Sequence, residues 1–218
     1  MSAFEPQPGD ERLTAAILSD SLDEEGFRAQ VLEPGLLPLA TGSRALGRAA
    51  TVRFAADETD PGDDPYRAAI RFIDGLASGE LVIAATGESR VSAVWGELFS
   101  AAALGTGVTG VVTDGALRDT DRIVALGFPA FAPARRPVDY RRRQAIAETR
   151  GRVELRGVAI EDGDLVMADD DGVVVVPRRA EAAVLARARE RMARESTVLT
   201  ELLAGETLGA VWARHGIL

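Results

Sequence analysis

The periodicity of hydrophobic and polar positions changes along the chain, and each periodicity predicts a different element. Residues 47–56 alternate apolar Ala50, Val52 and Phe54 with polar neighbours, which predicts a strand with one buried face. Short apolar runs indicate further buried strands, at 80–85 (ELVIAA), 109–115 (TGVVTDG) and 128–132 (FPAFA).

Apolar residues at three- and four-residue intervals predict helices between and around these strands. The predicted helices cover residues 10–19, 65–77, 96–105, 118–127, 178–204 and 206–216. Asp64 is the expected cap of the second helix, and either Asp119 or Asp121 that of the fourth. Gly105 and Gly127 are expected to end the third and fourth helices.

The stretch from residue 152 to 177 predicts strands that follow one another directly. They cover 152–160 (RVELRGVAI), 164–168 (DLVMA) and 172–177 (GVVVVP), joined by the tight turns EDGD and DDDG. Strands and helices that alternate before this point are typical of an α/β fold. We expect a single domain over 1–218, with an amino-terminal helical arm (1–20) and a long carboxy-terminal helix (178–204).

Length and composition add a compartment to this prediction. The chain has 218 residues, of which 46% are hydrophobic, enough for a soluble domain with its own core. Its apolar runs fall far short of the ~20 residues of a membrane span, and its amino terminus has no signal-peptide pattern. We therefore expect a cytoplasmic protein without a membrane partner.

The basic residues exclude several kinds of catalysis. All 25 are Arg, and without Lys there is no Schiff base, no pyridoxal phosphate attachment and no complete Walker A loop. His215 is the single His and Cys is absent, which argues against a Ser/His/Asp triad and against zinc. The remaining chemistry uses carboxylates, guanidinium groups, hydroxyls and amides, and an accompanying metal would be magnesium or manganese.

Two patterns favour no nucleotide or nucleic-acid partner. A net charge of −9 argues against nucleic acid; the arginines of ARRPVDYRRRQ (134–144) could touch an anion, but a solvated loop and helix start is the favoured interpretation. GTGVTG (105–110) has the glycines of a dinucleotide-binding loop, but it follows a helix and precedes a strand, the reverse of the order that such a loop requires.

Three places carry candidate functional residues. The first is the polar cluster after the strand GVVT, where ordinary turn and cap roles also account for its residues: Asp114, Gly115, Arg118, Asp119 and Asp121. The second is Gly96 and Glu97, because a helix start offers free amides to a carboxylate. The third is Glu195, on the apolar stripe of the long helix. It either pairs with a nearby Arg or enters the cleft of a neighbouring subunit.

The segments GELFSAAALGTGVTGVVTDGALRD and GDLVMADDDGVVVVP together resemble the family of regulator of ribonuclease activity A and the 4-hydroxy-4-methyl-2-oxoglutarate aldolases. The family signature is Gly-Glu or Gly-Asp, twenty residues, then Arg-Asp. Gly96 and Glu97, residues 98–117, then Arg118 and Asp119 have this spacing. The resemblance extends from about Leu81 to the end of the long helix.

The resemblance implies a layered α/β sandwich similar to the swivelling phosphohistidine domain, in a homotrimer or a dimer of trimers with active sites between subunits. It also implies a lyase that uses Mg²⁺ or Mn²⁺. The reactions would be retro-aldol cleavage of 4-hydroxy-2-keto acids, which releases pyruvate, and decarboxylation of oxaloacetate as a side activity. The partners are then a small keto acid and further copies of the chain.

The same resemblance implies a role for each site residue. Asp119 would ligate the metal and Glu97 would hold a metal-bound water. Arg118 would face the keto oxygen and the carboxylate, which the backbone from Gly96 through Leu98 to Phe99 would receive. Glu195 of the partner subunit would be an acid/base candidate.

The chain also departs from the family pattern. Where typical relatives carry an Asp-Asn pair, this chain has an acidic insertion (57–66) that contains Asp63, Asp64, Pro65 and Tyr66. In the family this region borders the cleft, so the resemblance does not identify the substrate. An alternative function is a non-catalytic protein that docks on an RNA-processing enzyme through the outer surface of the ring and regulates it. Its acidic surface could mimic or repel nucleic acid, and the region from Arg135 to Arg143 could contact an acidic partner.

Overall fold

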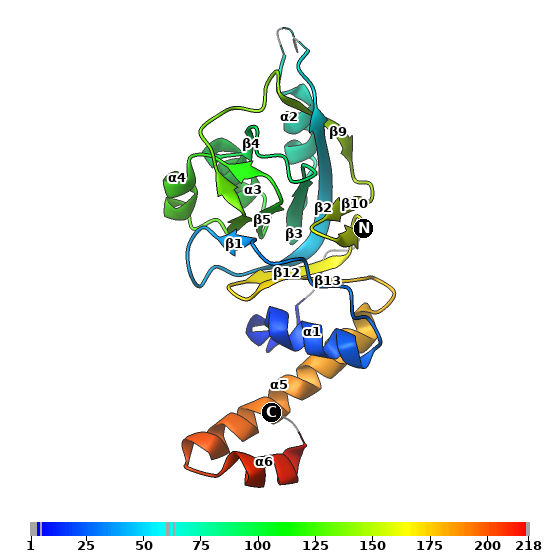
Figure 1. Cartoon of the computed structure of the whole chain (residues 1–218), viewed down its shortest axis with the longest axis vertical. Helices are drawn as coiled ribbons and strands as arrows, with labels where there is room; N and C mark the ends of the chain where they lie inside the picture. Colours follow the sequence, from blue (N-terminus) through cyan, green and yellow to red (C-terminus); the bar gives the residue numbers. More distant parts are fainter. Residues whose placement is uncertain (1–3, 5, 60–61, 63, 217–218) are drawn as a thin grey trace.

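The main sheet is built around one long strand, β2 (Ala45–Ala56). A computed structural model describes residues 4, 6–59, 62 and 64–216 (Figure 1). The sheet has the order β1 (Leu37–Pro38), β7 (Ala130–Ala132), β5 (Gly110–Thr113), β3 (Glu80–Ala85), β2, β12 (Leu165–Asp169) and β13 (Gly172–Val176), with β9 (Gln144–Thr149) also paired to β2. Strands β7, β5, β3 and β2 are parallel, whereas β1, β12, β13 and β9 pair antiparallel. The fold is mixed α/β, as the alternation of elements predicts.

The two faces of β2 are covered by different layers. Ala50, Val52 and Phe54 face the core beneath the helices α2 (Arg67–Asp74), α3 (Glu97–Gly105) and α4 (Thr120–Ala125). Ala49 lies in a second core beneath the hairpin of β10 (Val153–Leu155) and β11 (Val158–Ile160). The prediction of a single buried face is therefore wrong for the middle of β2, where Thr51 is fully buried and its Oγ1 donates a hydrogen bond to the Gly151 carbonyl (2.6 Å).

A second, smaller sheet positions the candidate site. It consists of the parallel strands β4 (Ala93–Trp95), β6 (Ala116–Leu117) and β8 (Ala134–Arg135). Each follows a strand of the main sheet along the chain, so that β3 leads to β4, β5 to β6 and β7 to β8. Helices α3 and α4 begin directly after β4 and β6, with Gly96 and residues 118–119 as the only connections. Periodicity did not predict these strands, since two or three residues show no period.

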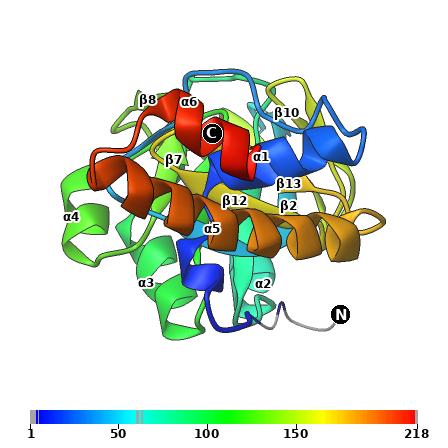
Figure 2. The same cartoon turned by 90° about the horizontal axis from the view of Figure 1, so that it is seen from below.

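The amino- and carboxy-terminal helices form a layer on the other side of the molecule. Helix α1 (Ala15–Glu24) packs its Leu18 and Leu22 against Leu165 and Met167 of β12, and α5 (Glu181–Leu203) packs on α1. Helix α5 then extends away from the sheets, and α6 (Leu208–His215) folds back along it (Figures 1 and 2). None of the described helices combines the length and apolarity needed to span a membrane.

Two predicted helix starts are wrong. The predicted helix 10–19 is a 3-10 turn (Asp10–Arg12) followed by α1, because Thr14 has extended backbone and its Oγ1 accepts a hydrogen bond from Ile17 N (3.2 Å). Asp64 does not cap α2, because the helix begins only at Arg67. The Asp64 carboxylate instead pairs with the Arg67 side chain (2.7 Å). Asp63, in the acidic insertion, lies outside the described residues.

The carboxy-terminal half confirms one hairpin and corrects two segments. Asp169 pairs with Gly172 across the DDDG turn, as predicted. The predicted strand 152–160 is a hairpin, because Arg156 and Gly157 both have positive φ (43° and 80°) and reverse the chain. The expectation of a helix start at the arginine run 134–144 is wrong, because the strand β9 begins there at Gln144. The comparison with the swivelling phosphohistidine domain and the single-domain boundaries stay predictions.

Candidate active site

The two halves of the Gly-Glu and Arg-Asp pattern meet because β4 and β6 are parallel neighbours. Trp95 pairs with Leu117, so the residues that follow each strand emerge at the same edge. A Cβ on Gly96 would lie 2.9 Å from Asp119 Oδ2 and 3.0 Å from Arg118 Cγ. The backbone of Gly96 is extended, so glycine is needed here for this close approach and not for its φ.

Asp119 occupies the N-cap position of α4, as one of the two sequence predictions has it, but its side chain does not cap the helix. Its backbone is left-handed (φ 54°, ψ 35°), and its carboxylate accepts no capping hydrogen bond from α4. The side chain is 46% exposed, and its Oδ2 lies 3.7 Å from Arg118 Nε. The carboxylate is therefore available to a ligand, in a backbone conformation that Asp tolerates better than most residues.

Arg118 is held by an acid that the sequence analysis did not single out. Its Nη1 lies 2.8 Å from Asp139 Oδ2, and the same oxygen accepts a hydrogen bond from the Tyr66 hydroxyl (2.8 Å). The other oxygen, Oδ1, accepts hydrogen bonds from Arg141 N (2.8 Å) and Arg141 Nε (3.2 Å). The one available signal was an isolated acid inside a run of arginines, where a buried counter-charge is expected.

The protonation of this group follows from its surroundings. Burial would raise the pKa of Asp139, but hydrogen bonds from Arg141 N and Tyr66, with the charges of Arg118 and Arg141, bring the pKa below its usual value. Burial, and then the hydrogen bond to Asp139, raise the pKa of Tyr66. Burial is also the main cause of the raised pKa of Tyr140. At neutral pH the Asp139 carboxylate is thus ionised and both phenols are protonated.

Arg118, Tyr66 and Tyr140 line a cavity of about 230 Å³ with largely apolar walls. Its lining residues are Tyr66, Ile70, Ala93, Val94, Trp95, Gly96, Glu97, Leu98, Phe99, Arg118, Asp119 and Tyr140. The first turn of α3 contributes Glu97, Leu98 and Phe99 to this lining, and the first N–H groups of an α-helix have no intrahelical partners. Trp95 Nε1 donates to Ser100 Oγ (2.8 Å), which donates to the Gly96 carbonyl (3.0 Å) and fixes this helix start.

Known proteins resemble this chain in sequence and in fold. The RraA-like family, described as Aldolase/RraA, matches residues 15–175. The chain belongs to the RraA-like family. Among curated relatives, protein DlpA of Legionella pneumophila is 27% identical over 194 residues, which cover 89% of this chain but 31% of DlpA, so this chain spans about a third of that relative.

Two further likenesses connect this RraA-like chain to different names. The "Putative 4-hydroxy-4-methyl-2-oxoglutarate aldolase" of Halalkalibacterium halodurans is 29% identical over 176 residues, 81% of this chain and 78% of that protein. The crystal structure of Streptomyces coelicolor RraAS2 is described as an unusual member of the RNase ES inhibitor RraA protein family. It superimposes with a TM-score of 0.76 at 25% identity, and the match covers 90% of this chain and 100% of RraAS2.

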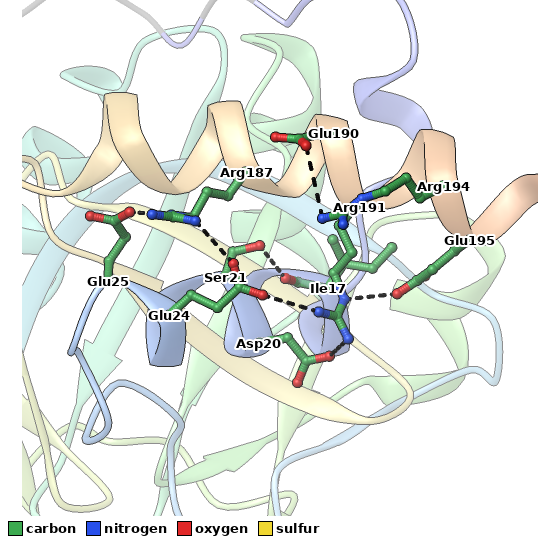
Figure 3. A network of polar contacts seen from close by, with 10 residues as sticks. All are labelled: Ile17, Asp20, Ser21, Glu24, Glu25, Arg187, Glu190, Arg191, Arg194 and Glu195. Carbon is green, nitrogen blue, oxygen red and sulfur yellow. Dashed lines mark hydrogen bonds and ion pairs between the residues drawn. The ribbon is translucent and has the colours of Figure 1, made fainter. Parts of the chain in front are cut away.

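Glu195 lies apart from the cavity of its own RraA-like chain. It is on α5, where Arg191 Nε donates a hydrogen bond to its Oε1 (2.8 Å), and Arg191 also pairs with Asp20 and Glu24 of α1 (Figure 3). Glu195 lines a separate hollow of about 340 Å³ with apolar residues of α1 and α5. The predicted pairing of Glu195 with a nearby Arg is confirmed. Its role in the cleft of another subunit stays a prediction.

The other acidic candidates have structural roles in this chain. Asp114 is buried, and its carboxylate accepts hydrogen bonds from Thr86 N (2.6 Å), Thr86 Oγ1 (2.8 Å) and Glu88 N (2.8 Å). It therefore holds the loop after β3. Asp121 lies exposed in the first turn of α4. The glycines of GTGVTG connect α3 to β5, and Gly107 takes positive φ (82°), in agreement with a tight connection.

The carboxylates of the cavity fit an ion that keeps much of its own water. Within the described residues, no group of three or more Asp, Glu or His side chains could enclose a metal. Asp119 and Glu97 are the acids that line the cavity, and Glu97 makes only a loose ion pair with Arg122 (3.8 Å). Magnesium binds proteins through one or two carboxylates and retains waters, so this donor set suits Mg²⁺ or Mn²⁺.

Proposed function

We propose that this RraA-like protein is a divalent-metal-dependent pyruvate aldolase. Its substrates would be 4-hydroxy-2-keto acids such as 4-hydroxy-4-methyl-2-oxoglutarate, with decarboxylation of oxaloacetate as a side activity. The supporting observation is that a helix amino terminus, Arg118 and Asp119 meet at one cavity, and that the Asp119 side chain makes no capping hydrogen bond to α4. Relatives named as aldolases for this substrate agree with it.

The keto-acid end of the substrate has a complementary place in the cavity. The amides from Gly96 through Leu98 to Phe99 begin α3 and would receive the carboxylate, because the amino end of a helix favours an anion. Arg118 would donate hydrogen bonds to the same carboxylate and to the neighbouring keto oxygen. The ion pair with Asp139 (2.8 Å) keeps the guanidinium in position before substrate arrives.

The cleavage step creates negative charge that these residues would stabilise. A base removes the proton of the C4 hydroxyl, the C3–C4 bond breaks, and its electron pair forms the enolate of pyruvate, which takes up a proton. Arg118 lies beside the keto oxygen on which the charge develops. Asp119 would hold Mg²⁺ or Mn²⁺, with Glu97 nearby. When bound, the ion would supply Lewis-acid polarisation of the keto group in place of a Schiff base.

The proton acceptor and the assembly belong to the same proposal. Glu97 and Glu195 of the partner subunit are the acid/base candidates, with the active sites between subunits of a trimer or a dimer of trimers. Two apolar residues that line the cavity are exposed, Leu98 to 79% and Ile70 to 49%. Their exposure supports a partner subunit that covers the cavity.

A coupled assay of pyruvate release tests the proposed function. The purified full chain is expected to release two pyruvates from each 4-hydroxy-4-methyl-2-oxoglutarate when Mg²⁺ or Mn²⁺ is present. It is also expected to release pyruvate from oxaloacetate faster than the uncatalysed background. EDTA should abolish both activities, and excess Mg²⁺ should restore them. Absence of turnover with both substrates would contradict the proposal.

A second function has its own support in the likeness to RraAS2, a member of an RNase inhibitor family. In that case the chain would be a non-catalytic regulator that binds an RNA-processing enzyme, with its net charge of −9 directed at a basic partner. Silence in the pyruvate assay, together with binding to such an enzyme, would favour this function.

A further inference from the structure

The cavity continues beyond the place proposed for the keto-acid end. Besides Gly96, Arg118 and Asp119, its lining includes the rings of Tyr66 and Tyr140. Next to these tyrosines is a second, open hollow of about 620 Å³, which Asp139 and Arg141 line. The two spaces are adjacent, because Asp139 contacts both Arg118 and Tyr66 at 2.8 Å.

Arg141 lines the open hollow and packs against Tyr66, a residue of the cavity wall. Its guanidinium lies over the Tyr66 ring, 5.3 Å from the centroid, and its Nε donates to Asp139 Oδ1 (3.2 Å). The side chain is 50% exposed, and this Nε bond is the hydrogen bond that its guanidinium makes to the described residues. The Nη groups therefore remain as donors on a guanidinium already held by a ring and a carboxylate, so little freedom is lost on binding an anion.

The charge around Arg141 favours an anionic ligand. Arg141 and Arg143 line the open hollow together with Asp139. Asp139 is shared with Arg118, so one carboxylate faces two guanidinium groups at the junction of the spaces. The paired N–H donors of Arg match the two oxygens of a carboxylate, so a carboxylate is the anion that best fits Arg141.

From this geometry we infer that Arg141 binds the distal carboxylate of a dicarboxylic 2-keto acid whose keto-acid end lies at Gly96 and Arg118. The inference rests on the proposed function for the place of the keto-acid end. It makes Arg141 a specificity-determining residue outside the Gly-Glu and Arg-Asp pattern. The apolar rings of Tyr66 and Tyr140 would contact the carbon chain between the two carboxylates.

A matched pair of ligands tests this inference without turnover. The two ligands are 2-oxoglutarate and 2-oxopentanoate, which share the keto-acid end and the length of the carbon chain and differ in the distal carboxylate. Neither has the 4-hydroxyl group needed for retro-aldol cleavage. Calorimetric titration of the full chain with Mg²⁺ should give a Kd for 2-oxoglutarate about tenfold or more below that for 2-oxopentanoate, because charge-assisted hydrogen bonds are strong.

Variants separate a direct contact from a general effect of charge. Arg141→Gln should remove the preference for 2-oxoglutarate while the Kd for 2-oxopentanoate stays within about twofold, and Arg141→Lys should retain part of the preference. Arg67→Gln is the matched control, because Arg67 is next to Tyr66 but its exposed side chain pairs with Asp64 outside the cavity. This variant should keep the preference in full.

Contrary results are clear for each part. Equal affinity of the wild type for the two ligands, or an unchanged preference in Arg141→Gln with wild-type circular dichroism, would overturn the inference. The proposed function is judged separately by pyruvate release from 4-hydroxy-4-methyl-2-oxoglutarate. An active aldolase that lacks the preference contradicts only the role of Arg141, whereas an inactive protein that shows the preference contradicts only the aldolase.

Discussion

Asp139 connects the residues of the candidate site more directly than any residue of the signature does. One oxygen accepts from Arg118 and Tyr66, and the other accepts from the backbone and side chain of Arg141. Because Asp139 also forms a bridge with Ala93 at the start of β4, it joins the turn before β9 to the second sheet. We infer that it is a positioning residue, which acts on substrate through Arg118.

Asp139→Asn is expected to reduce kcat/KM for pyruvate release by about 10- to 100-fold, since the neutral amide holds Arg118 less firmly than a charge-assisted bond does. The dependence of activity on Mg²⁺ concentration should not move, because Asp119 is untouched. Glu148→Gln is the control: it breaks an exposed ion pair with Arg53 and should leave the kinetics unchanged. A large shift of the Mg²⁺ dependence in Asp139→Asn would contradict the positioning role.

The same variant should change stability in one pH range. The pKa of Asp139 is lowered in the folded chain, so its contribution to the free energy of unfolding is complete above the unfolded value, near 3.8, and is lost as pH falls through the folded value. Urea unfolding at pH 7 and pH 5 should show the same deficit for Asp139→Asn relative to wild type. The deficit should shrink at pH 3; a constant deficit would contradict the lowered pKa.

At the scale of elements, the long or strongly patterned segments were predictable and the short ones were not. The buried run 80–85, the helix that starts at Gly96 and the hairpin of β12 and β13 were predicted from apolar period and turn residues. The strands β4, β6 and β8 are too short for a period. The run of arginines concealed β9, since strand residues there follow a turn in which Arg142 takes positive φ.

The candidate site shows the same division. Gly96, Glu97, Arg118 and Asp119 could be selected because their spacing is a family pattern. Tyr66, Asp139 and Arg141 could not, since the contacts that join them to Arg118 cross 73 residues of sequence from Tyr66 to Asp139 and depend on tertiary packing. Sequence alone also left Asp119 as either a helix cap or a ligand residue. Its left-handed backbone and the absence of a capping hydrogen bond from its side chain distinguish these roles.

Two substitutions should separate site geometry from helix stability. Gly96→Ala places a Cβ against Asp119 Oδ2 and Arg118 Cγ, two partly exposed side chains that can move, so activity should fall strongly while the free energy of unfolding changes little. Thr14→Ala removes the cap of α1 and should lower the free energy of unfolding by about 1 kcal/mol without affecting activity. Urea unfolding and the pyruvate assay measure both. Full activity in Gly96→Ala would show that this close approach is not needed.

At the scale of the whole molecule, the two candidate functional regions lie on opposite layers. The cavity is lined by β4 of the second sheet, whereas Glu195 belongs to α5. In Figure 1, α5 runs from below β12 and β13 past α1 and away from the sheets. The outer part of α5 and the helix α6 expose Leu199, Leu203, Leu208 and Trp212. Exposed apolar residues on the helix that carries Glu195 agree with contact between copies of the chain.

Mixing of inactive variants tests whether a site uses two subunits. Asp119→Asn and Glu195→Gln are each expected to lose most pyruvate release. Mixed by unfolding and refolding together, they should regain part of the activity, because some sites would combine an intact Asp119 with an intact Glu195 of the partner subunit. Variants refolded separately and then assayed together are the control. Full activity of Glu195→Gln alone, or no recovery in the mixture, would contradict the shared site.

The most direct test of the central claim, that Asp119 anchors a metal ion for pyruvate chemistry, is pyruvate release as a function of Mg²⁺ concentration. Wild type is compared with Asp119→Asn, which tolerates the same left-handed backbone, and with Asp121→Asn, an exposed acid two residues away on α4. We predict saturating activity in wild type and Asp121→Asn and none above background in Asp119→Asn at any Mg²⁺ concentration, with equal unfolding free energies. Equal Mg²⁺-dependent turnover in Asp119→Asn would contradict the account.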